Sequence, residues 1–189
     1  ELDRIGREAE RLDELIAQLL SLARLEAQAG PAVREPVDLR ALLRDVVEGV
    51  RFEAHGERRE IGLAEGEALN VTGDPALLHS ALENIVRNAL RHTVENAAID
   101  IVLSRDPERR DTIRIDVRDH GPGVPEELLT RLFEPFVRAD SARSRDRGGA
   151  GLGLAIARQA VRLHGGEVVA ENAAGGGLRV RISLPGSEE

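Results

Sequence analysis

Two asparagines one helical turn apart are the residues whose type and spacing most directly suggest chemistry. Asn84 and Asn88 lie at positions i and i+4, and Arg91 continues the same stripe if the segment is helical. Asparagine is a weak helix former, and solvent-exposed helix faces normally carry glutamate, lysine or arginine instead. Magnesium prefers hard oxygen ligands and takes the remaining ones from water and phosphate. The stripe therefore indicates a magnesium–phosphate site, and a solvated helix face is the alternative.

A carboxylate followed by two glycines is the second candidate. Asp119 closes a run of alternating apolar residues and precedes Gly121 and Gly123. The carboxylate can accept a hydrogen bond from the exocyclic amine of adenine, whereas guanine presents a carbonyl at that edge. The glycines would let the backbone approach a flat ring. An ordinary turn after a strand is the alternative, because Asp-x-Gly-Pro-Gly also favours turns.

Four glycines ahead of a predicted helix form the third candidate. They are Gly148, Gly149, Gly151 and Gly153. Free backbone N–H groups at a helix start, together with the helix dipole, attract phosphate. A flexible hinge is the structural alternative, and the two roles can coexist. Residues 138–147 contain four arginines and no apolar side chain larger than alanine, which is typical of a mobile lid. The chain contains no lysine, so a P-loop is excluded.

Helices and strands must bring these segments together. The chain has 189 residues and 41% hydrophobic content, enough for one core and a smaller appendage. Helices are expected over about 1–27, after an N-cap at Asp38, after Asp74-Pro75, and over about 151–164. Strands are expected at 60–64, 69–72, 99–103, 113–117, 167–171 and 178–184. This order indicates an α+β fold with an antiparallel or mixed sheet covered on one face by helices.

The first predicted helix has a heptad seam. Leu2, Ile5, Ala9, Leu12, Ile16, Leu19 and Ala23 alternate spacings of three and four. Further leucines widen the apolar stripe, which favours a helical bundle over a two-stranded zipper. A polar linker at 26–36 separates this helix from the rest. The pattern predicts self-association, and an ordinary helix packed on its own domain is the alternative.

Composition narrows the classes of partner. The net charge is −8 and all 26 basic residues are arginines, without basic tracts or interleaved aromatics, so we expect no nucleic-acid binding. No apolar run approaches the roughly 18 residues of a membrane-spanning helix, so we expect no membrane contact by this chain itself. Cysteine is absent, which excludes disulfides and thiolate metal sites. Methionine is absent even at position 1, and we expect a fragment of a longer protein.

The order of four segments resembles the N, G1, G2 and G3 boxes of bacterial sensor histidine kinases, and the CpxA-type subgroup in particular. The segments are 83–88, 119–123, 148–154 and 163–166. The resemblance covers nearly the whole chain and implies the GHKL, or Bergerat, ATP-binding fold. This fold is an α/β sandwich whose mixed, mostly antiparallel sheet is covered by helices on one face, here preceded by one long dimerisation-bundle helix. It implies the second helix of the dimerisation and histidine-phosphotransfer domain at 1–29, a linker at 30–37, and the catalytic and ATP-binding domain at 38–186.

The resemblance also implies ATP and Mg²⁺ as cofactors. Asn88 is the expected metal ligand, Asn84 supports the phosphate region, and Arg138 matches an arginine that reaches the terminal phosphate. Phe133 and Phe136 match the family's F box and are expected to anchor the base of the lid by packing; docking of the helical domain is the second role considered for them. The expected nucleotide-binding residues are Asn84, Asn88, Arg91, His92, Asp119, Gly121, Gly123, Arg138, Gly149, Gly151, Leu152, Gly153 and Leu154. His164, in the third glycine box, is expected to be structural.

Members of this family pass the γ-phosphoryl group of ATP to a histidine, for relay to an aspartate of a response regulator. None of the five histidines has the surroundings of that acceptor, so the acceptor is expected on a dimerisation helix absent from this chain. The expected partners are a response regulator and a second copy bound through the N-terminal helix. The expected location is the cytoplasmic portion of an inner-membrane sensor kinase.

Two alternative functions stay open. A nucleotide-binding or dimerisation module without catalysis is favoured by Arg91, His92 and Ala150, where the family often has lysine, tyrosine and threonine. A serine kinase of the anti-sigma-factor type is disfavoured by Asn84. Those kinases resemble the gyrase, Hsp90 and MutL group, which carries a glutamate there to activate water. An amide cannot accept that proton.

Overall fold

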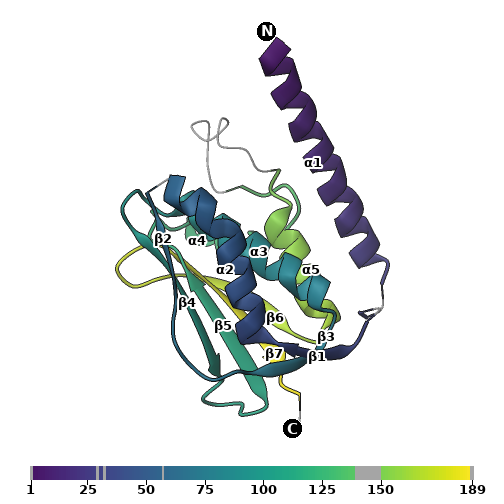
Figure 1. Ribbon diagram of the computed structural model, residues 1–189, viewed down its shortest axis with the longest axis vertical. Coiled ribbons are helices and arrows are strands. Elements are labelled where there is room, and N and C mark those ends of the chain that lie inside the picture. The colour runs from purple at the N-terminus through teal and green to yellow at the C-terminus, as the bar shows by residue number, and fades with distance from the viewer. Residues whose placement is uncertain (1, 29, 32, 57, 139–149, 188–189) are drawn as a thin grey trace.

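Helices cover one face of a five-stranded sheet in the computed structural model (Figure 1). The structure describes residues 2–28, 30–31, 33–56, 58–138 and 150–187. The sheet contains, in spatial order, β2 (Glu60–Leu63), β4 (Ala98–Arg105), β5 (Thr112–Arg118), β7 (Leu178–Pro185) and β6 (Glu167–Asn172). β2 pairs with β4 in parallel, and the other pairs are antiparallel. The predicted α+β fold with a mixed, mostly antiparallel sheet is confirmed.

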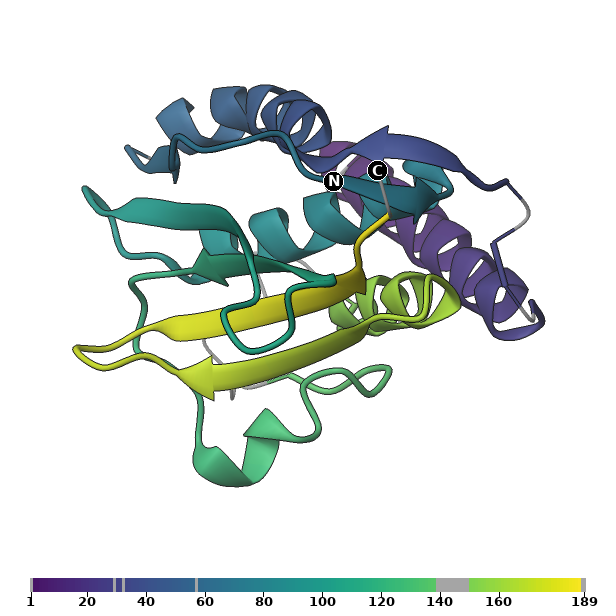
Figure 2. The same cartoon turned by 90° about the horizontal axis from the view of Figure 1, so that it is seen from below.

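Alternation along the strands makes the sheet two-sided. In β5, Ile113, Ile115 and Val117 are at most 1% exposed, while the intervening residues are half-buried. The buried residues face α2 (Leu39–Gly56), α3 (Pro75–His92) and α5 (Gly153–Leu163), which share one core with the strands. The opposite face carries cross-strand ion pairs, such as Arg181 Nε to Asp116 Oδ1 at 2.9 Å. Figure 2 shows α2 near the β2 edge and α4 (Glu126–Leu129) beyond the β6 edge.

Local signals explain where α2 and α3 begin. The Asp38 carboxylate accepts from the backbone N–H groups of Arg40 and Ala41, at 2.8 and 3.1 Å. Asp74 likewise accepts from two backbone N–H groups at the start of α3, and proline occupies the first helical position. Both predicted N-caps are confirmed. The buried face of α3 consists of Leu78, Ala81, Leu82, Ile85, Val86, Ala89 and Leu90, which leaves the asparagine stripe on the other side.

A second, two-stranded sheet contains one strand that the sequence did not predict. Residues 35–37, expected in the linker, belong to β1 (Glu35–Asp38), which pairs antiparallel with β3 (Asn70–Gly73). Val37 and Val71 face each other in this pair and are both buried. The short sheet therefore ties the segment before α2 to the segment before α3.

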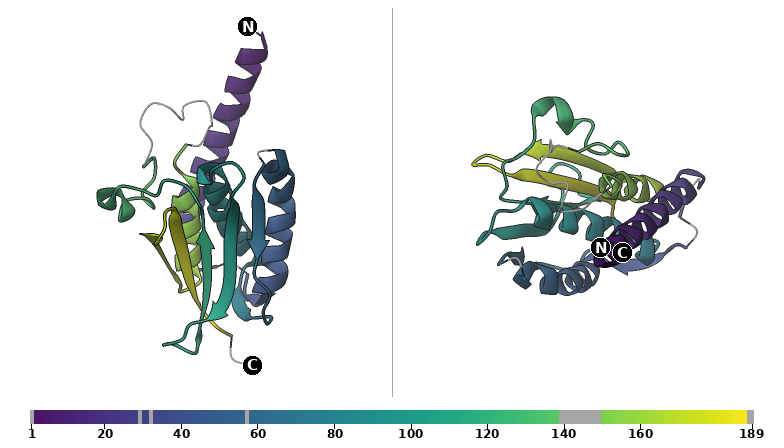
Figure 3. Two further views of the ribbon diagram at one scale, coloured as in Figure 1. Left: turned by 90° about the vertical axis from the view of Figure 1, so that its left-hand side faces the viewer. Right: turned by 90° about the horizontal axis from the view of Figure 1, so that it is seen from above.

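The first helix, α1 (Leu2–Glu26), packs on α5 through its C-terminal half. Leu22 and Leu25 are buried with Leu152, Ala155 and Ile156 in a cluster separate from the main core. The Gln159 side chain also donates to the Leu25 carbonyl at 3.2 Å. Figure 3 shows that the N-terminal part of α1 extends beyond the rest of the molecule. Within the described part of the chain, no helix combines the length and apolarity needed to cross a bilayer.

His164 joins the two helices that flank the candidate site. Its Nδ1 lies 2.7 Å from the Ala160 carbonyl, and its Nε2 lies 2.9 Å from the backbone nitrogen of Asp74. Because the Asp74 N–H must donate to Nε2, Nδ1 carries the proton and donates to Ala160. The ring is buried, and Gly73 leaves room for it because a Cβ at Gly73 would collide with the imidazole. The expected structural role of His164 has a clear basis: it fixes the end of α5 to the start of α3.

We predict that His164→Ala lowers the free energy of unfolding by about 2–4 kcal/mol, because it leaves a cavity and an unpaired buried N–H group. Urea denaturation followed by circular dichroism measures this change. His79→Ala is the matched control, since the His79 side chain is 40% exposed, and its expected effect is within about 0.5 kcal/mol. Equal stability of the His164 variant and the wild type would contradict the assigned role.

Candidate functional site

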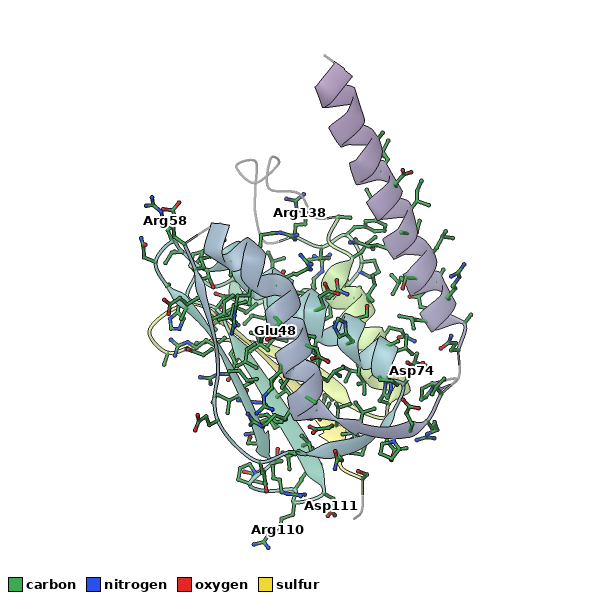
Figure 4. All side chains as sticks on the ribbon, in the orientation of Figure 1. Glu48, Arg58, Asp74, Arg110, Asp111 and Arg138 are labelled. Carbon is green, nitrogen blue, oxygen red and sulfur yellow. The ribbon has the colours of Figure 1, made fainter. Side chains whose placement is uncertain are left out.

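A cavity of about 210 Å³ lies where α3, the start of α5 and the end of β5 meet. Most of the residues predicted to bind nucleotide line it. These are Asn84, Asn88, Arg91, His92, Asp119, Gly123, Arg138, Gly151, Gly153 and Leu154. Figure 4 labels Arg138, which lines the cavity, and Asp74, which caps the start of α3. Segments that are distant from one another in the sequence thus line one cavity.

Three predicted residues do not line the cavity. Gly149 lies outside the described residues, as does most of the lid expected at 138–147. Gly121 packs beneath the site, because a Cβ there would collide with the His92 carbonyl. Leu152 is fully buried and its side chain packs against α1. Gly121 and Leu152 therefore shape the site through backbone position and packing.

The two asparagines of α3 have different surroundings. The Asn84 side-chain amide donates to the Ser80 carbonyl at 2.8 Å. Its Oδ1 faces Gly153, where an added Cβ would lie only 2.8 Å away. Asn84 thus packs closely against the first residue of α5. Among the described residues, no group hydrogen-bonds the Asn88 amide. Asn88 lines the cavity, and its amide is available to a ligand.

Asp119, which follows β5, lines the same cavity and is buried, with only 3% of its surface exposed. Its Oδ1 accepts from the backbone N–H groups of Gly121 and Leu178, at 2.9 and 3.0 Å. Its own N–H donates to the Leu178 carbonyl at 2.9 Å. No donor among the described residues reaches Oδ2. One carboxylate oxygen is thus occupied by backbone, and the other can accept from a ligand.

The start of α5 offers free backbone donors. Its N-cap residue, Leu152, supplies no side-chain acceptor, and no acidic residue lies in the first turn. Gly151 has φ +73° and approaches Phe136 and Val137 so closely that a Cβ would not fit. The cavity side of this helix start is therefore suited to an anion.

The expected packing role is confirmed for Phe133 but not for Phe136. Phe133 is buried in the main core. Phe136 is 58% exposed and has φ 66°. Its backbone N–H donates to the Gly151 carbonyl at 2.9 Å. The expectation that the Phe136 ring packs at the base of the lid is therefore wrong, because most of its surface is exposed.

Several lining residues were not predicted. They are Gln18, Arg87, Pro122, Val124, Leu132, Val137, Ala150 and Leu178. Arg87 follows Asn84 by three positions, so helical spacing could have identified it. It forms an ion pair with Glu83, with Nη2 3.0 Å from Oε1. Gln18 belongs to α1, and only the docking of that helix brings it to the cavity.

We predict that Gly121→Ala lowers the free energy of unfolding by about 1–3 kcal/mol, because the new methyl group collides with the backbone at the end of α3. Chemical denaturation measures the effect. Gly49→Ala is the matched control, since nothing lies within 4 Å of a Cβ there, and helix propensity should make it more stable by about 0.5–1 kcal/mol. Identical changes in the two variants would refute this close approach.

Comparison with known proteins agrees with this geometry. Residues 73–188 match the family of histidine kinase-, DNA gyrase B- and HSP90-like ATPases. The chain is 42% identical over 187 residues to the sensor histidine kinase CpxA of Escherichia coli K12, covering 98% of this chain and 39% of CpxA. It is 32% identical over 184 residues to WalK of Bacillus subtilis, covering 96% of this chain and 30% of WalK. The chain thus spans well under half the length of these relatives.

Solved structures give the same result. Full-length ShkA in complex with AMPPNP superposes with a TM-score of 0.83 at 31% identity, covering 97% of this chain and 37% of that one. The catalytic domain of the histidine kinase ThkA gives a TM-score of 0.70 at 28% identity, covering 80% of this chain and 95% of that domain. The predicted resemblance, including that to the CpxA-type subgroup, is confirmed. This chain belongs to the histidine kinase-, DNA gyrase B- and HSP90-like ATPase family, and within it to the sensor histidine kinases.

Proposed function

We propose that this chain binds Mg-ATP in the cavity and positions its γ-phosphoryl group for transfer to a histidine on a helix outside this sequence. The observation that carries the proposal is convergence: Asp119, Asn88 and the start of α5 all line one cavity. Each offers a different chemistry, namely a carboxylate, an amide oxygen and backbone N–H groups. A purine triphosphate with a bound cation needs all three.

The proposed roles follow from position. Asp119 Oδ2 accepts from the adenine amine, and Gly123 lies beside the ring. Backbone N–H groups at Gly151, Gly153 and Leu154 bind phosphate oxygens. Arg91, His92 and Arg138 line the same cavity and add donors or positive charge. Gly121 and Leu152 contribute through backbone position and packing, whereas Gly149 lies outside the described residues.

The donor set fits magnesium. Asn88 offers a neutral amide oxygen, and the described residues contain no cluster of three or more histidine, cysteine or acidic side chains able to hold a metal by themselves. A cation here takes its remaining ligands from phosphate and water, as magnesium commonly does. When bound, it would neutralise charge on the transferring phosphoryl group.

The charge distribution supports transfer over hydrolysis. Among the described lining residues, Asp119 is the sole carboxylate, and it follows β5 instead of belonging to α3 or α5. Glu83, one position before Asn84, forms an ion pair with Arg87 and does not line the cavity. The described residues that line the phosphate end therefore include no carboxylate to activate water. Catalysis there consists of positioning and charge neutralisation.

The parent assembly belongs to the same proposal. We assign residues 1–29 to the dimerisation and histidine-phosphotransfer domain, 30–37 to the linker, and 38–186 to the catalytic and ATP-binding domain. The exposed side chains Leu12, Ile16, Leu19 and Leu20 give α1 an apolar face for a second copy. A response regulator receives the phosphoryl group, and the chain is the cytoplasmic portion of a membrane-bound sensor kinase.

We predict that Asp119→Asn weakens binding of Mg-ADP and of a non-hydrolysable Mg-ATP analogue at least about 10-fold, or about 1.4 kcal/mol. The amide oxygen can keep both backbone hydrogen bonds, but the amide nitrogen then faces the adenine amine, donor against donor. Isothermal titration calorimetry measures the affinities, with and without magnesium. Asp116→Asn, on the open face of the sheet, is the matched control and should bind as the wild type does. Absence of binding by the wild type would disprove the proposal.

We further predict phosphoryl transfer in trans. The wild-type chain, mixed with a separate domain that carries the family's acceptor histidine, should label that domain from [γ-³²P]ATP without labelling itself. The label should be acid-labile, as expected of phosphohistidine. Asp119→Asn should reduce the rate at limiting ATP. A chain that binds Mg-ATP but never labels the acceptor domain would instead support the non-catalytic module, for which Arg91, His92 and Ala150 are the observed departures.

A further inference from the structure

One of the residues that line the cavity, Gln18, belongs to α1 and lies outside the proposed catalytic domain. Gln18, in the middle of α1, lines the cavity together with Asn84, Arg87 and Ala150. It lies on the same helical face as Leu15, Leu22 and Leu25, which are spaced by seven and three residues and pack on the catalytic domain. The side-chain amide of Gln18 is therefore presented to the cavity by the docked face of α1.

The packing places Gln18 at the phosphate end. Leu22 and Leu25 of α1 are buried with Leu152, Ala155 and Ile156, and Leu77, Ala150 and Leu163 lie at the margin of this cluster. The Leu25 carbonyl accepts from Gln159 in the middle of α5, and Gln18 lies about two turns earlier in α1, toward the start of α5 (Figure 1). The two residues proposed for the adenine end, Asp119 and Leu178, are hydrogen-bonded to each other and are not members of that cluster. A neutral amide donor beside free helix N–H groups can bind a phosphate oxygen without further charge.

Leu152 connects helix docking to the backbone of the site. It lies between Gly151 and Gly153, both of which line the cavity, and its own side chain is fully buried under α1. Its carbonyl accepts from Ile156 at 2.9 Å as the first hydrogen bond of α5. Undocking of α1 would expose Leu152 and remove the packing that fixes the first turn of α5. The position of the phosphate-facing N–H groups therefore depends on α1.

We propose that α1 is part of the nucleotide site: the Gln18 amide donates to an oxygen of the terminal phosphate, and α1 docking and triphosphate binding stabilise each other. This inference rests on the proposed function. Coupling between two binding events is reciprocal, so whatever α1 adds to nucleotide affinity the nucleotide returns to α1 docking. The terminal phosphate lies farthest from Asp119, so the triphosphate senses α1 more strongly than the diphosphate does.

The test uses the full chain, with the Mg complexes of ADP and of a non-hydrolysable ATP analogue as probes. Gln18→Ala removes the amide and leaves the packing of α1 intact. Leu25→Asp places a charge in the buried contact and undocks α1. Gln28→Ala, an exposed position of the same residue type, is the matched control. Circular dichroism confirms that each variant stays folded, and titration calorimetry gives both affinities.

We expect Gln18→Ala to weaken the ATP analogue about 5- to 10-fold while changing ADP affinity less than about 2-fold. Leu25→Asp should weaken the analogue at least as much, and Gln28→Ala should have no effect. In the reciprocal experiment, the analogue should slow amide hydrogen exchange at residues 15–25 in the wild type more than in Gln18→Ala.

Two results would overturn the inference. One is unchanged analogue affinity in both Gln18→Ala and Leu25→Asp, and the other is an equal loss for both nucleotides in Gln18→Ala. In either case the wild type and Asp119→Asn still report on the proposed function independently. If the wild type binds neither nucleotide, the proposed function itself fails, and the inference fails with it.

Discussion

Asp74 joins the two helices that border the cavity. Its carboxylate holds the first backbone amides of α3, and its own N–H donates to His164 at the end of α5. Because α3 supplies the asparagines and α5 supplies the phosphate-facing N–H groups, this junction sets the separation of the two. At the far end of α3, the buried Arg59 donates from Nη1 to the Leu90 carbonyl at 2.7 Å, which stabilises the helix C-terminus. Hydrogen bonds thus stabilise α3, which supplies the asparagines of the cavity, at both of its ends.

The cavity itself is polarised. Asp119 provides negative charge at one end, while Arg87, Arg91 and Arg138 line the remainder. This arrangement matches a nucleotide whose base carries a donor amine and whose phosphates carry negative charge. Among the described residues, no carboxylate of α5 lines the cavity. The site is therefore suited to binding a triphosphate and not to hydrolysing it. A glutamate at position 84 would add a carboxylate to the cavity lining, whereas the Asn84 amide lies against Gly153.

The two faces of α1 have different tasks. Leu22 and Leu25 bury themselves against α5, and Gln18 reaches the cavity from the same face. Leu12, Ile16 and Leu19 remain exposed on another face and are available to a second helix. A helix that is apolar on two sides can link assembly on one side to the nucleotide site on the other. The heptad seam predicted the exposed face, and the structure adds the docked one.

Sequence by itself determined the features that depend on local chemistry. Alternation predicted β4 and β5, the Asp38 and Asp74 caps predicted the starts of α2 and α3, and the period of 3.6 placed Asn84 and Asn88 opposite the core. The ordered boxes predicted the family. Only the tertiary structure decided that Glu35–Asp38 pairs with Asn70–Gly73, that the Phe136 ring stays exposed, and that Gln18 and Leu178 meet at one cavity. β1 contains a proline and only one buried side chain, Val37, so no alternation marks it as a strand. Contacts between residues far apart in the chain depend on how whole elements pack, and no local period encodes that packing.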